Sequence, residues 1–199
     1  MSATKGQQIG IWIIAIVMTV GTIGSFVVLI LANDNDAKDK ITEQSTQAEQ
    51  LKAYQEQVKV QAQANADNSV ALDGYSPSTF DAASITALQK EILVSGTGDE
   101  LKATDTIKVS YFGWTSNGVI FDSSKKKDVG KDEPIELSLS GVIKGWTDGL
   151  TGQRVGSTVK LSIPADQAYG PTGSGIIGAN EPLVFIVTIQ SIVAATATE

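Results

Sequence analysis

The chain has 199 residues, 22 acidic and 15 basic side chains, a formal net charge of −7, and neither cysteine nor histidine. The length suits one folded domain of ordinary size with additional segments attached. The missing residue types exclude disulfides, thiolate nucleophiles, cysteine-ligated metals and a histidine general base, and we expect neither a metal nor an organic cofactor. The net negative charge argues against nucleic acid as a partner, because binding to phosphates needs positive charge.

An uninterrupted apolar stretch follows a short N-terminal tail of residues 1–8. Residues 9–32 contain no charged side chain, and as a helix rising about 1.5 Å per residue they would exceed the ~30 Å hydrocarbon thickness of a bilayer. A cleavable signal peptide would have a shorter apolar region and a small-residue cleavage site. A buried helix of a soluble domain would seldom run so far without a charge. The pattern therefore predicts a transmembrane helix.

The charges that flank this stretch carry little information about its orientation. Lys5 precedes it, and Lys38 and Lys40 follow it. By the positive-inside rule, this small excess of lysines on the C-terminal side would place the C-terminal part in the cytoplasm. Long domains, however, translocate largely regardless of flanking charge. We expect a membrane-anchored protein whose folded domain lies outside the cytoplasm.

Residues 33–68 are rich in Gln, Ala, Lys, Glu and Asp and contain no proline or glycine. These residue types favour helix, so we expect a polar helical stalk. Gln44, Gln55 and Asn65 interrupt the a and d positions of a possible heptad, so any coiled coil would be weak. Dimerisation through the stalk is therefore a minor alternative. The apolar residues at these heptad positions are Ile41, Ala48, Leu51, Val58 and Ala62.

Glycine and proline punctuate residues 69–87, which we interpret as a boundary segment before a folded domain of residues 88–193. Within that domain apolar and polar residues alternate, the pattern of half-buried strands. Three such runs stand out. They are Ile107, Val109 and Tyr111; Val159, Leu161 and Ile163; and Leu183, Phe185, Val187 and Ile189.

The connections between these runs indicate an antiparallel sheet with little helix. Asn117 and Gly118 favour a hairpin turn. Residues 145–151 are the one internal segment expected to be helical, and because they contain two glycines, the packing of Ile143, Trp146 and Leu150 must hold them. Residues 194–199 are expected to form a flexible tail. The sequence predicts a sheet wrapped over one short helix.

Six short motifs follow one another along this domain, and together they are specific although each alone is common. They are Tyr-x-Gly from Tyr111, Phe-Asp-Ser-Ser from Phe121, Val-Ile-x-Gly-Trp from Val142, Ala-Tyr-Gly from Ala168, Gly-Ile-Ile from Gly175 and Leu-Val-Phe from Leu183. Over residues 88–193 the sequence resembles the FKBP-type peptidyl-prolyl cis/trans isomerases, the macrolide-binding immunophilins. The resemblance implies an α+β fold in which an antiparallel β-sheet curls around one short α-helix.

The resemblance also implies an apolar pocket that receives a proline ring. Trp146 would form its floor, and a flap loop would cover it. Asp122, Tyr169, Ile143 and Trp146 would be the catalytic residues: a carboxylate, a hydroxyl at the rim, a backbone N–H for a substrate carbonyl, and the floor. The substrate-binding residues would be Tyr111, Phe121, Val142 and Phe185 in the walls, beside Ile143, and Ile176 and Ile177 on the flap.

Isomerisation of an X-Pro bond suits a chain without histidine or cysteine. Its barrier of ~18–20 kcal/mol comes from amide resonance, and no sigma bond breaks. An apolar pocket lowers the barrier by removing water that stabilises the planar amide and by gripping the proline. We therefore expect a peptidyl-prolyl isomerase that assists folding of extracytoplasmic proteins. Its partners would be proline-containing segments, with macrolide inhibitors as candidate ligands.

Plainer interpretations of the same residues remain open. Trp146 and Phe185 could be ordinary core packing, Asp122 could cap the turn that follows it, and residues 125–127, three lysines, are expected to form a solvated loop. For the function, one alternative is a module or chaperone that binds proline-containing or unfolded segments with little turnover. Another is an oligomerisation element presented by the stalk.

Overall fold

The computed structural model describes residues 37–193, and the boundary between its two compact units falls after Ala62. The predicted tails, residues 1–8 and 194–199, and the predicted transmembrane helix, residues 9–32, lie outside the described residues. Among residues 37–193, no helix combines the length and apolar character needed to cross a bilayer. The transmembrane helix stays a prediction from the sequence.

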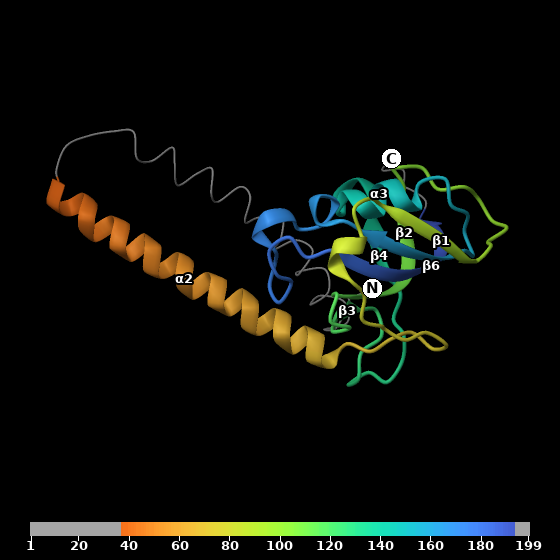
Figure 1. The fold of residues 1–199 in the computed structure, drawn as a ribbon, viewed down its shortest axis with the longest axis horizontal. Helices are drawn as coiled ribbons and strands as arrows, with labels where there is room; N and C mark the ends of the chain where they lie inside the picture. The colour runs from red at the N-terminus through yellow and green to blue at the C-terminus, as the bar shows by residue number, and fades with distance from the viewer. Residues whose placement is uncertain (1–36, 194–199) are drawn as a thin grey trace, which may run out of the picture. The chain divides into compact units, whose positions relative to one another are not determined.

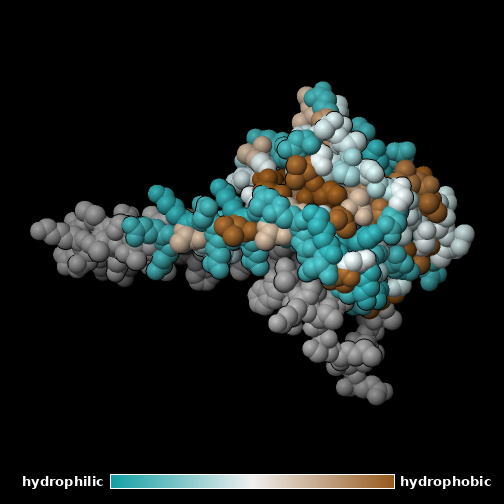
Figure 2. Space-filling model, turned by 90° about the horizontal axis from the view of Figure 1, so that it is seen from below, coloured by the Kyte–Doolittle hydropathy of each residue, from teal (hydrophilic) through white to brown (hydrophobic). Residues whose placement is uncertain are grey.

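One long helix, α2, runs over Ala37–Asn68, inside the segment predicted to be a helical stalk (Figure 1). Its described surface is largely hydrophilic, whereas a broader apolar area is visible on the folded domain (Figure 2). Leu51 and Val60 are exposed. The second compact unit begins at Gln63. Residues 63–68, which the sequence pattern assigns to the stalk, therefore belong to the folded unit.

The folded unit is built on a six-stranded sheet in which every pairing is antiparallel, as predicted (Figure 1). The strand order is β1-β5-β6-β2-β3, and β4 also pairs with β2. The strands are β1 (Gln89–Val94), β2 (Thr106–Trp114), β3 (Ile120–Ser123), β4 (Ile135–Ser138), β5 (Thr158–Ile163) and β6 (Leu183–Val193). A 3-10 turn, η1 (Ala82–Ser84), precedes β1, and three others lie between strands: η2 (Leu139–Gly141), η3 (Ala165–Gln167) and η4 (Gly170–Thr172).

The alternating residues of the predicted strands are buried, as expected, but two strands are buried on both faces. In β2, Tyr111 is 4% exposed and its neighbour Phe112, on the opposite face, is 0% exposed. In β6, Phe185 and Ile186 are likewise both buried. The prediction of half-buried strands is therefore wrong for the centre of the sheet, because a further layer covers its second face.

That layer comes from residues 69–87, the predicted boundary segment. Leu72 packs into a cluster with Phe112, Trp114 and neighbours from β6, and the segment adds further partly buried side chains. The indole N–H of Trp114 donates to the Ser78 carbonyl oxygen at 2.9 Å. The segment is thus part of the core rather than a linker. Its partly buried residues against the cluster are Ala71, Tyr75, Phe80 and Ile85.

The one short α-helix of the folded unit, α3 (Lys144–Leu150), lies against β5 and agrees with the predicted internal helix. Both of its glycines lie at close contacts with the sheet. A Cβ at Gly145 would come within 2.3 Å of Ile163 Cγ2, and one at Gly149 within 2.7 Å of Leu161 Cδ2. The glycines weaken the helix locally, but they let it approach the sheet closely enough to bury Trp146 and Leu150.

Candidate functional site

Four aromatic rings from four different elements meet on one face of the sheet. Tyr111 of β2, Phe121 of β3, Trp146 of α3 and Phe185 of β6 are each at most 8% exposed. Trp146 meets Tyr111 with ring centroids 5.4 Å apart and Phe185 at 5.3 Å, and Phe121 meets Phe185 at 5.5 Å. All three pairs are close to perpendicular, the edge-to-face geometry that aromatic quadrupoles favour. We call these residues the four-ring cluster.

Gly113 makes the space for this cluster. It lies two residues after Tyr111 in β2, on the same face, and it pairs with Phe185 of β6 and with Asp122 of β3. A Cβ at this position would lie 2.5 Å from Phe185 Cε1 and 2.6 Å from Phe121 Cζ. The Tyr-x-Gly motif therefore has a direct steric reason: the third residue has to be glycine for the two phenylalanines to meet.

The indole N–H of Trp146 is buried without a hydrogen-bond partner among residues 37–193. Buried donors in folded proteins are nearly always paired, and an unpaired one costs roughly 1–3 kcal/mol. Trp146 is only 4% exposed, which would fit ordinary core packing. Its unpaired N–H is what makes it unusual for a core residue.

Asp122 is a buried carboxylate that already accepts hydrogen bonds from four donors. Its Oδ2 accepts the hydroxyl of Tyr111. Its Oδ1 accepts the Ser123 N–H at 2.8 Å, Asn65 Nδ2 at 2.9 Å and Lys126 Nζ at 3.0 Å. Two carboxylate oxygens offer about four acceptor positions. The carboxylate is therefore largely occupied by the protein's own donors, and it joins the four-ring cluster to residues outside it.

Both tyrosines near the site keep their protons at neutral pH. Burial, then the Asp122 charge, raises the pKa of Tyr169 from its ordinary 10.0 to about 12. Burial, followed by the charge of Asp122 and its hydrogen bond, raises the pKa of Tyr111 well above the ordinary value. Both hydroxyls are therefore hydrogen-bond donors. The Tyr111 hydroxyl donates to Asp122.

The remaining predicted site residues lie at the start of α3 and on the loop after η4. Val142 and Ile143 are half-buried, and the Ile143 N–H makes no hydrogen bond to another backbone carbonyl among residues 37–193. In the loop, Ser174 and Ile177 exchange two backbone hydrogen bonds, of 3.0 and 2.8 Å. Ile177 is buried and Ile176 is half-buried. These two hydrogen bonds close the loop into a turn that carries both isoleucines.

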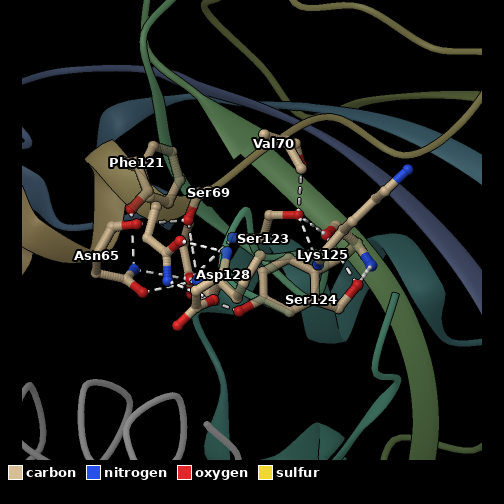
Figure 3. Close-up of polar contacts among 12 residues, drawn as sticks. Asn65, Ser69, Val70, Phe121, Ser123, Ser124, Lys125 and Asp128 are labelled. Atoms are coloured by element: carbon tan, nitrogen blue, oxygen red, sulfur yellow. Dashed lines mark hydrogen bonds and ion pairs between the residues drawn. The ribbon is translucent and has the colours of Figure 1, made fainter. Parts of the chain in front are cut away.

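Three residues of this site were missed from the sequence: Asn65, Ser69 and Lys126. Asn65 interrupts a heptad and Lys126 lies in a run of three lysines, so local patterns favour exposure for both. The expectation of a solvated lysine loop is wrong for Lys126, whose side chain is 16% exposed and paired with Asp122, and for Lys125, whose 17% exposed side chain pairs with Asp73. No periodicity signals a contact between segments so distant in the chain. Figure 3 shows Asn65 and Ser69 beside Phe121 and Ser123.

Comparisons with known proteins agree on one family for the folded domain. Residues 98–190 match the family model of the FKBP-type peptidyl-prolyl cis-trans isomerases. The protein FkpA of Aeromonas hydrophila, an FKBP-type peptidyl-prolyl cis-trans isomerase, is 44% identical over 105 residues, which cover 53% of this chain and 38% of that protein. FkpA of Escherichia coli K12 is 32% identical over 175 residues, covering 82% of this chain and 63% of that protein.

A third relative, the outer membrane protein MIP of Legionella longbeachae, is 42% identical over 106 residues, covering 53% of this chain and 44% of that protein. The chain therefore spans less than two thirds of each of these three relatives. The resemblance inferred from the six motifs is confirmed for the folded domain.

Proposed function

Because residues 98–190 form an FKBP-type peptidyl-prolyl cis-trans isomerase domain, we propose that the whole chain catalyses cis–trans isomerisation of X-Pro bonds in unfolded or folding polypeptides. The observation that carries the proposal is the four-ring cluster around Trp146, whose indole N–H has no hydrogen-bond partner in the described part of the chain. The cluster offers aromatic side chains for a proline ring. It contains no nucleophile, and rotation about an amide needs none.

An aromatic, water-poor surface lowers the rotation barrier in two ways. It removes water from the planar, charge-separated amide, and it fixes the proline ring while the preceding carbonyl swings. A thousandfold acceleration requires roughly 4 kcal/mol of differential stabilisation. Packing against a few rings and one or two hydrogen bonds can supply an energy of this size.

In the proposed mechanism two donors bind the substrate, and the Asp122 carboxylate orients the four-ring cluster through Tyr111. The Ile143 N–H has no backbone acceptor among residues 37–193, and the Tyr169 hydroxyl is protonated at neutral pH. Both bind carbonyl oxygens of the substrate. Asp122, already engaged by four donors, orients Tyr111 and the cluster. It takes no proton from the substrate.

We also propose that residues 9–32 anchor the protein in a membrane and that the isomerase domain acts on proteins outside the cytoplasm. The support for the anchor is the charge-free apolar stretch. The support for a location outside the cytoplasm is that the Legionella longbeachae relative is named an outer membrane protein. Deleting residues 9–32 is expected to move the protein from the membrane pellet to the supernatant. Protease added to spheroplasts is expected to cleave the domain; protection would place it in the cytoplasm.

The test of the activity is the cis-to-trans rate of a short X-Pro peptide with and without the full chain. Trp146→Phe is expected to lower kcat/KM by about tenfold, the effect of ~1.4 kcal/mol in the transition state. Trp114→Phe is its matched control, because it removes an indole from the opposite face of the sheet and is expected to leave kcat/KM unchanged. If the folded chain binds proline peptides without accelerating isomerisation, it is a binding module, and the proposed activity fails.

A further inference from the structure

A residue of α2, outside the stretch that matches the family, is hydrogen-bonded to Asp122 of the candidate site. We propose that Asn65 is a positioning residue that acts through Asp122, so that the end of the helical stalk takes part in the proposed isomerisation. The inference rests on the proposed function for its catalytic consequence, whereas the contact itself can be tested without activity. Lys126 is the second member of this arrangement.

The Asn65 side chain contacts three groups at the site. Its Nδ2 donates to Asp122 Oδ1 at 2.9 Å and to the Phe121 carbonyl oxygen at 3.2 Å, and its Oδ1 accepts Lys126 Nζ at 2.6 Å. One amide therefore binds both members of the ion pair and the backbone of a residue in the four-ring cluster. Asn65 is 7% exposed.

The end of α2 is tied to the loop after β3 by more than this one side chain. Ser69 Oγ donates to the Asn65 carbonyl oxygen at 2.7 Å and accepts Lys126 Nζ at 2.9 Å. The Lys127 N–H donates to the Asn68 carbonyl oxygen at 2.8 Å. These contacts hold the backbone carbonyls of Asn65 and Asn68 at the end of α2, and the Asn65 amide is directed towards Asp122. Asn65 and Ser69 are labelled in Figure 3.

The geometry connects Asn65 to Tyr111 and hence to the proposed proline-binding rings. Asn65, Lys126 and the Ser123 N–H occupy Oδ1 of Asp122, so Oδ2 is the oxygen that faces the Tyr111 hydroxyl. Without Asn65, the Asp122 carboxylate loses the donor from α2 that helps to fix its rotation, and Lys126 loses an acceptor. Hydrogen bonds to ionised groups are stronger than neutral ones, and misplacing a catalytic group by about 1 Å can cost ~100-fold in rate.

Asn68 provides a matched control on the same helix end. It has the same side chain, three residues further on, and it contacts the same loop: its Nδ2 donates to Asp128 Oδ1 at 2.9 Å, and its Oδ1 accepts the Asp128 N–H at 3.1 Å. Those contacts are exposed and do not involve Asp122. A general weakening of the helix–loop contact would affect both asparagines, whereas positioning of Asp122 would affect Asn65 alone.

The activity test compares kcat/KM of the full-length wild type, Asn65→Ala, Asn68→Ala, Asp122→Asn and the double variant Asn65→Ala/Asp122→Asn. Asn65→Ala is expected to lower kcat/KM by about tenfold and Asn68→Ala by less than about twofold. In the Asp122→Asn background, Asn65→Ala is expected to lower kcat/KM by less than a further factor of about two, because the carboxylate through which Asn65 acts is already absent. Equal losses in the two alanine variants, or a full tenfold loss in the Asp122→Asn background, would overturn the inference.

A second readout separates this inference from the proposed function. In nuclear magnetic resonance spectra of the full chain, the side-chain amide signals of Asn65 are expected to shift in Asp122→Asn, whereas those of Asn68 stay in place. If wild type shows no isomerase activity but these shifts occur, the proposed function fails and the contact stands. If the Asn65 signals do not respond, the inference fails. Should Asn65→Ala not fold, Asn65→Ser, which keeps a polar group in the buried position, is expected to lower kcat/KM in the same direction.

Discussion

The two faces of the central sheet carry two aromatic clusters that begin at adjacent residues of β2. On one face, Phe112 and Trp114 stack with centroids 5.1 Å apart and planes at 19°, and Ser78 accepts the indole N–H. On the other face, Tyr111 and Trp146 meet at 85°, and the Trp146 indole N–H has no partner among residues 37–193. Composition alone would not separate these clusters. The hydrogen bonds of the two indoles do: the N–H of Trp114 has an acceptor, whereas that of Trp146 has none among residues 37–193.

The strongest effect is expected in the cluster of Phe112 and Trp114 and should appear in stability. Trp114→Ala removes a buried indole, its stacking on Phe112 and its hydrogen bond to Ser78. The free energy of unfolding is expected to fall by about 3–5 kcal/mol, measured by urea denaturation. The rate per folded molecule is expected to stay unchanged in the isomerase assay. A large loss of rate at full folding would show that the two faces are not independent.

An added methyl group at Gly113 is expected to disturb the packing of the four-ring cluster. In Gly113→Ala, the new methyl group would meet Phe121 and Phe185 at under 3 Å, and the rings must separate. Overpacking of this kind costs about 1–3 kcal/mol of stability, and kcat/KM is expected to fall by at least about tenfold. Gly178→Ala is the control, since a Cβ there meets nothing within 4 Å. Equal activity in the two variants would contradict the assigned site.

The contrast between the clusters also explains which parts of the structure could be predicted from the sequence. Alternation along the strands and the apolar residues around Trp146 predicted the sheet and α3, because these depend on local pattern. The four rings were implied by the family resemblance that the ordered motifs carry. Burial of the second face could not be predicted, because it depends on where residues 69–87 fold back. Asn65 was missed for the same reason, since its partner Asp122 is 57 positions away. Local polarity indicates solvent exposure unless a distant segment supplies the hydrogen bonds.

A smaller effect tests whether the Asp122 charge acts on the four-ring cluster. Asp122→Asn keeps an acceptor for the neighbouring donors and removes the negative charge. Because burial is the largest cause of the raised Tyr111 pKa and Asp122 supplies the next two, the pKa of Tyr111 is expected to fall but to stay above 10. Tyrosinate absorption during an alkaline titration, with Tyr111→Phe to assign the signal, measures this change. An unchanged titration would mean that the Asp122 charge does not affect the pKa of Tyr111.

The last effect concerns Tyr169, is absent at neutral pH and appears only in alkali. The pKa of Tyr169 is about 12 in the folded chain and is expected to take the ordinary 10.0 when unfolded. Between these values the folded state binds more protons than the unfolded state, so this tyrosine's contribution to stability is complete below pH 10 and is lost as the pH rises towards 12. Tyr169→Phe removes this dependence. Urea denaturation at intervals from pH 9 to 12 is therefore expected to show a steeper fall in the free energy of unfolding for wild type than for Tyr169→Phe. Parallel curves would mean that the Tyr169 hydroxyl is as solvated in the folded chain as in the unfolded chain. The donor role proposed for it in a water-poor site would then be wrong.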